Sequence, residues 1–159
     1  MKAVTIKELK DELVNYSPKE LRELCLRLAR FKKENKELMT YLMFEASDES
    51  SYIENIKHEV DEQLAQINKK SPYLIKKSFR KIVRTIRKYS HYSLKKETEV
   101  ELMIFFCAKI KKFTPSVTSN SGLHKFYLRQ VDIIRKKIPL LHEDLQFDFG
   151  TELSDLVLL

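Results

Sequence analysis

The sequence has few of the residues that sheets, tight turns and cofactor-binding loops require. Among 159 residues there are two glycines, four prolines and no tryptophan. Hairpin turns and phosphate-binding loops use glycine at fixed positions, so this composition excludes many-stranded sheets, P-loop folds and Rossmann folds. Apolar residues make up 43% and charged residues 33% of the chain, which is typical of a folded domain. The sequence therefore predicts an all-α protein.

Cysteines and long apolar runs are also scarce. Cys25 and Cys107 each lie in an apolar helical run, and we expect both to be small buried side chains in a reducing compartment. The longest purely apolar run is Leu102–Ala108, which is too short to span a bilayer. The first twelve residues lack the apolar segment of a signal peptide. We therefore expect a cytoplasmic protein without a transmembrane segment.

Helix-start signals and apolar periodicity predict about seven helices. Thr5 and Ser17 each precede a glutamate by three residues, as in a capping box, and Ser71 precedes a first-turn proline. Asn35 and Ser93 are expected to cap two further helices. The predicted helices begin near residue 5 and then cover about 17–33, 35–45, 48–68, 72–89, 95–112 and 123–138.

The helix at about 95–112 is predicted to be central. Its apolar residues surround the whole axis at about 100° per residue, and a helix that is apolar all round must be enclosed by others. We expect either a compact helical bundle or a short HEAT-like stack of helical hairpins around it. Residues 1–138 would form a single helical domain. Residues 139–159 would form a short helix and an acidic, apolar tail that ends at Leu158 and Leu159 and either docks or frays.

Charge is sorted along the chain. The net charge is +7, yet residues 69–137 contain 19 lysines and arginines against 4 acids. From Lys69 to Lys96 there are eleven basic residues and no acid. On a helical projection of residues 72–89, the apolar side chains fall on one face and the basic ones on the other. The chain therefore holds a continuous cationic face about four turns long.

This cationic face has three explanations. Lysines and arginines on one face suit the phosphate backbone of a nucleic acid, or another polyanion, without sequence readout. The acidic residues of 45–62 or the acidic tail could instead neutralise the face from within the chain, and a partner protein could do the same. The face could also be solvated. The candidate polyanion-binding residues are Lys69, Lys70, Tyr73, Lys76, Lys77, Arg80, Lys81, Arg84, Arg87, Lys88, His91, Lys95 and Lys96.

Catalytic and metal-binding patterns are weak. Glu54, His58 and Glu62 share one helical face, but no second helix supplies a matching pair for a metal site. Cys107 lies in the most apolar segment, which is unfavourable for a nucleophile. We expect no catalytic residue, cofactor or metal.

Three functions stay open at this point. The leading prediction is a non-enzymatic helical protein that binds nucleic acid or another polyanion with low sequence specificity. The alternative is a protein–protein adaptor whose basic face is neutralised by acidic segments, with an acidic protein or a second copy of this chain as partner. The second alternative is an enzyme with a bundle-type site. Peripheral membrane binding is disfavoured, because the apolar face of 72–89 is needed for the core.

Overall fold

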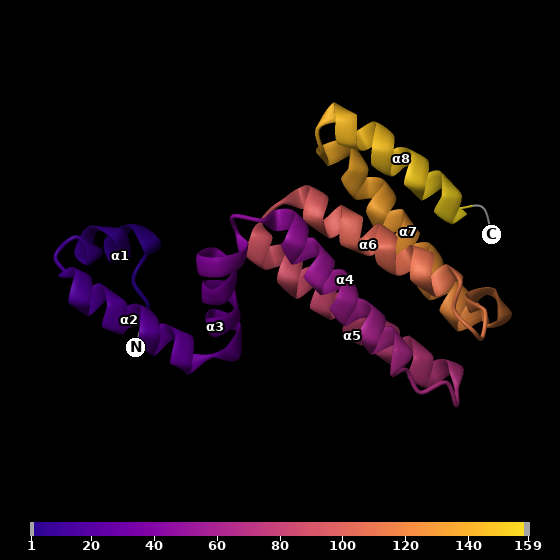
Figure 1. The fold of residues 1–159 in the computed structure, drawn as a ribbon, viewed down its shortest axis with the longest axis horizontal. Helices are drawn as coiled ribbons and strands as arrows, with labels where there is room; N and C mark the ends of the chain where they lie inside the picture. Colours follow the sequence, from indigo (N-terminus) through magenta and orange to yellow (C-terminus); the bar gives the residue numbers. More distant parts are fainter. Residues whose placement is uncertain (1, 158–159) are drawn as a thin grey trace. The chain divides into compact units, whose positions relative to one another are not determined.

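The computed structural model describes residues 2–157, and every regular element in that range is helical (Figure 1). The prediction of an all-α fold is confirmed, with eight α-helices among the described residues where about seven were predicted. The helices are α1 (Ile6–Leu13), α2 (Pro18–Phe31), α3 (Lys33–Thr40), α4 (Glu49–Ala65), α5 (Pro72–Ser93), α6 (Lys96–Lys111), α7 (Ser121–Lys137) and α8 (Glu143–Val157). Short helical turns lie at Tyr41–Glu45, Val117–Ser119 and Ile138–Leu140.

Contacts within the chain divide it into two compact units, residues 1–44 and residues 45–159. The sequence pattern predicted one helical domain over residues 1–138. Helices α1, α2 and α3 have no buried residue among their described positions. Whether residues 1–138 fold as one cooperative domain stays a prediction.

The first unit contains α1, α2 and α3. Capping boxes begin two of its helices, since the Thr5 and Ser17 side chains accept hydrogen bonds from the amides of Glu8 and Glu20. The predicted cap at Asn35 is wrong. Its amide donates instead to the carbonyl of Leu28 at 2.8 Å, so it satisfies the last turn of α2 rather than the first turn of α3.

The second unit is a helical bundle around α6, as predicted. Helix α6 contacts α4, α5, α7 and α8, and its buried residues include Val100, Leu102, Phe106 and Cys107, which are all fully buried. A helix that is apolar on every side is stable only when neighbours cover every side. This arrangement positions α5 and α7, both of which pack against α6 and against each other.

The predicted cap at Ser93 is also wrong. Ser93 is the last residue of α5, and the N-cap of α6 is Lys95, whose side chain makes no capping hydrogen bond. Helix α5 extends beyond its predicted end because Ser90 and Tyr92 continue its buried face. It ends where Leu94 adopts a left-handed conformation with φ of 59°.

The C-terminal segment forms a longer helix than the sequence indicated. Helix α8 covers Glu143–Val157 and packs against α6 and α7 through Phe149, Leu153 and Leu156. The Tyr127 hydroxyl donates a 2.8 Å hydrogen bond to the carbonyl of Leu156. Of the two predicted outcomes for this segment, docking is the one observed. Residues 158 and 159 of the predicted tail lie outside the described residues.

The two cysteines differ. Cys107 is buried, as expected, and desolvation raises the pKa of its thiol to about 12. Cys25 is exposed, so the prediction that it is buried is wrong. It lies on α2, where only Leu21, Leu26 and Ala29 are half-buried. In the first unit, apolar sequence neighbours therefore do not predict that a side chain is buried.

Candidate anion-binding groove

Helix α5 holds its cationic face outward because its other face is buried. Ser71 caps the helix by accepting a hydrogen bond from the amide of Leu74 at 3.3 Å, and Pro72 occupies the first turn. Phe79 is fully buried on the inner face, and its ring meets the Phe106 ring edge-on at 5.8 Å. This anchoring leaves the lysines and arginines of the opposite face in solvent.

Helix α7 lies beside α5 and brings a second set of cations to it. The Asn120 side chain caps α7 by accepting hydrogen bonds from the amides of Gly122 and Leu123. Phe126 stacks on Phe79 with ring centres 5.9 Å apart, which joins the two helices. Lys125 and its neighbour one turn later, Arg129, flank Phe126 and are exposed.

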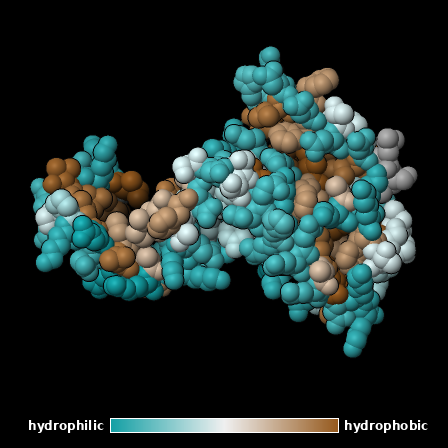
Figure 2. Space-filling view, viewed as in Figure 1, coloured by the Kyte–Doolittle hydropathy of each residue, from teal (hydrophilic) through white to brown (hydrophobic). Residues whose placement is uncertain are grey.

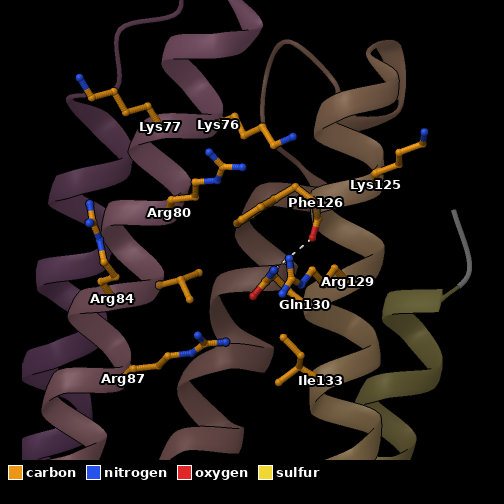
Figure 3. Close-up of a pocket in the computed structure, with 11 residues that line it drawn as sticks. Lys76, Lys77, Arg80, Arg84, Arg87, Lys125, Phe126, Arg129, Gln130 and Ile133 are labelled. Atoms are coloured by element: carbon orange, nitrogen blue, oxygen red, sulfur yellow. Dashed lines mark hydrogen bonds between the residues drawn. The ribbon is translucent and has the colours of Figure 1, made fainter.

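A groove of about 600 Å³ lies between α5 and α7 (Figure 3). Figure 3 shows Lys76, Arg80 and Arg87 extending from α5 toward α7, and Arg129 extending back toward α5, whereas Lys125 points outward. The floor between them is apolar. The lining residues are Lys76, Lys77, Arg80, Val83, Arg84, Arg87, Lys125, Phe126, Arg129, Gln130 and Ile133.

The seven basic residues of this groove have no acidic counterpart in the part of the chain that the structure describes. No acid is among the lining residues, and none of the seven forms an ion pair with any of residues 2–157. Like charges crowded along one groove repel one another, which is a cost to the folded state. The same field attracts a ligand with several negative charges.

Two acids of α4 have partners outside the groove. Glu49 accepts hydrogen bonds from Ser93 at 2.5 Å and from buried Thr98 at 2.6 Å, and its other oxygen lies 3.4 Å from the Lys95 ammonium. Glu54 pairs with Lys57 within the same helix at 2.7 Å. Internal neutralisation therefore accounts for Lys95 but not for the cations of the groove.

Two more ion pairs connect α4 to α6. Lys57 lies 2.8 Å from Glu101, and Asp61 lies 2.8 Å from Lys109. Of the acids of α4, Asp61 therefore pairs with α6, and none lines the groove.

Gln130 is an unusual part of the groove lining. Its side-chain NH₂ donates to the carbonyl of Phe126 at 3.3 Å, and the residue is 4% exposed. Its side-chain oxygen is buried and has no hydrogen-bond partner among the described residues. The bond to Phe126 fixes which way the amide points, so a buried acceptor lies unpaired beside the cations.

Five of the predicted binding residues line the groove, namely Lys76, Lys77, Arg80, Arg84 and Arg87. The others are placed elsewhere. The ammonium groups of Lys69 and Lys88 lie 4.6 Å from the ring centres of Phe113 and Tyr89, and Lys81 lines a small depression beside α4. The remaining predicted residues outside the groove lining are Lys70, Tyr73, His91, Lys95 and Lys96.

Sequence reasoning missed the contribution of α7. Lys125 and Arg129 are spaced four residues apart, so they lie on one helical face, and they belong to the basic region 69–137. That spacing was a usable signal. What the sequence could not supply was the pairing of α7 with α5, which depends on tertiary packing. Gln130 carried no signal, because its role depends on burial.

A metal-binding cluster and a membrane-spanning helix are both absent from the described part of the chain. Residues 2–157 contain no cluster of three or more histidine, cysteine, aspartate or glutamate side chains arranged to hold a metal ion. None of the described helices combines the length and hydropathy of a membrane-spanning segment. Comparisons of the sequence with models of known families and with curated proteins, and of the structure with solved structures, found no match.

Proposed function

We propose that this protein is a non-enzymatic binding protein that holds the phosphate backbone of a nucleic acid in the groove between α5 and α7. One observation carries the proposal. Seven cations from two helices line a single groove without an acidic partner among residues 2–157. A ligand with regularly spaced negative charges relieves their mutual repulsion and releases its own counterions.

The length of the groove suits a polynucleotide. Lys76 and Arg87 are eleven residues apart on α5, so the row of cations extends about 16 Å along the helix. Phosphates on one strand of a duplex are spaced about 3.4 Å along the axis. Because the strand also winds around the axis, a straight row of this length contacts about three successive phosphates.

The groove offers few groups that read base edges. Arginine and lysine contacts to phosphate fix the position of a protein on a duplex without reading its sequence. Apart from its cations, the groove presents apolar side chains and the single amide of Gln130. We therefore expect low sequence specificity.

A charge-reversal variant tests the proposal. Arg80, Arg84 and Arg87 are exposed, so the triple change R80E, R84E and R87E leaves the core unchanged. We expect its affinity for a short labelled DNA duplex to fall about a hundredfold or more, because three attractive charges become repulsive. Fluorescence anisotropy at fixed salt concentration measures the change.

The matched control is a second triple variant with the same change in net charge. Lys10, Lys36 and Lys112 are exposed and lie outside the groove, and we expect K10E, K36E and K112E to reduce affinity less than about tenfold, through the long-range field alone. Equal losses in the two variants would contradict a site in the groove. Wild-type protein that does not bind the duplex at low salt would contradict nucleic-acid binding altogether and favour the adaptor function.

A further inference from the structure

The first unit carries an apolar stripe that nothing in the described chain covers. Leu24, Leu28 and Phe31 lie on one face of α2 with spacings of four and three residues, and Leu28 and Phe31 are 53% and 77% exposed. Figure 2 shows apolar residues on the surface of this unit. A unit of about 40 residues without a core of its own usually depends on association for stability.

The charges beside this stripe are ordered. On a helical projection, Glu20, Glu23, Arg27 and Arg30 lie along one flank of the stripe, and Lys19 lies at the outer edge of the same flank. A shallow depression of about 660 Å³ follows this flank, and its lining includes these four residues and Leu24. None of the four forms an ion pair with any other residue of the described chain.

We infer that α2 pairs antiparallel with α2 of a second copy of this chain. In a two-fold arrangement of antiparallel helices the same flanks meet. A symmetry axis near Cys25 then brings Glu23 beside Arg27 of the second copy, and Glu20 beside Arg30 of the second copy. The apolar stripes meet at the same time, with Leu24 near the centre and Leu28 and Phe31 toward the two ends of the contact.

The order of the charges selects a second copy rather than an unrelated partner. Glu23 and Arg27 lie on opposite sides of the axis and carry opposite charges, so their ion pair forms twice in the symmetric dimer. The dimer also buries the stripe that the isolated unit exposes. The association closes at two copies because each stripe is used once.

The first test is the mass of the full-length protein in solution as a function of concentration, measured by sedimentation equilibrium. We expect a monomer–dimer equilibrium without larger species, and we expect L28E to weaken dimerisation at least a hundredfold by placing a charge in the apolar contact. A protein that is monomeric up to about 1 mM, where even weak association is visible, would overturn the inference. A dimer that L28E leaves unchanged would overturn it as well.

Exchanging the charges of Glu23 and Arg27 gives a sharper test. Both residues are exposed on α2. E23R alone and R27E alone each place like charges together twice in the dimer, and we expect each to weaken it about tenfold. The double variant E23R and R27E restores opposite charges, so its dimerisation should return to within about threefold of wild type. Additive losses in the double variant would contradict the antiparallel register.

A membrane surface as the occupant of the stripe would give a different result. Binding of wild-type monomers, but not of L28E, to vesicles of anionic phospholipid would assign the stripe to a membrane surface and overturn the dimer. Dimerisation through α2 and duplex binding in the α5–α7 groove are separate properties. We expect L28E to leave the intrinsic affinity of each groove for a DNA duplex unchanged.

Discussion

At the scale of single residues, Gln130 shows how the groove differs from an ordinary core. A buried amide oxygen without a partner costs about 1–3 kcal/mol of stability. The only hydrogen bond of its side chain, to the carbonyl of Phe126, is long at 3.3 Å. Among the described residues its oxygen is left without a partner beside a groove lined by cations.

Methionine can replace Gln130 with a side chain of similar shape that has no amide. We expect Q130M, which keeps an unbranched chain of similar length, to raise the free energy of unfolding by about 1 kcal/mol, because it removes the unpaired acceptor. Urea denaturation followed by circular dichroism measures the change. A loss of stability would mean that the oxygen has a partner, such as a bound water.

The two cysteines provide a second test at this scale. Desolvation raises the pKa of Cys107 to about 12, so at pH 8 only about one thiol in ten thousand is ionised there. Cys25 is exposed. We expect a thiol reagent to modify one cysteine per native chain and the second only after unfolding, with C25S removing the native reaction. Rapid modification of both cysteines in the native protein would contradict the burial of α6.

At the scale of elements, α5 is the helix on which the site depends, and its beginning is set by sequence. Ser71 caps the amide of Leu74 and Pro72 fixes the first turn. The apolar face of the helix then anchors it against α6. Both features were readable from the sequence, as was the outward direction of Arg80, Arg84 and Arg87.

Removal of the α5 cap should be measurable. We expect S71A to lower the free energy of unfolding by about 1 kcal/mol, as is typical for the loss of a serine N-cap. S154A, at an exposed position in the last turn of α8, serves as the control and should change stability by less than about 0.5 kcal/mol. Equal effects of the two substitutions would contradict the role of Ser71.

Prediction from sequence failed where an element depends on distant contacts. Helix α8 was predicted as a short helix with an undecided tail, because only packing against α6 and α7 extends it to Val157. The caps expected at Asn35 and Ser93 were misplaced because both side chains bond to other elements, Leu28 and Glu49 respectively. Local propensity carries no information about such partners.

At the scale of the whole molecule, the sequence showed that positive charge is concentrated in residues 69–137 but not how it is arranged in space. Most of the candidate site could be predicted, because α5 alone carries five of the seven lining cations. The other two cations require the packing of α7 beside α5. The acids of α4 could have covered the cationic face, and only the structure shows Glu49, Glu54 and Asp61 engaged elsewhere.

The dependence of duplex binding on salt tests the central claim most directly. If about three phosphates are contacted, the logarithm of the association constant should fall with the logarithm of salt concentration with a slope of about −3. Neutralising Arg80 and Arg87 in the double variant R80Q and R87Q should reduce the magnitude of that slope by about 2. A slope near zero for the wild-type protein, or one that the double variant leaves unchanged, would contradict phosphate binding in the α5–α7 groove.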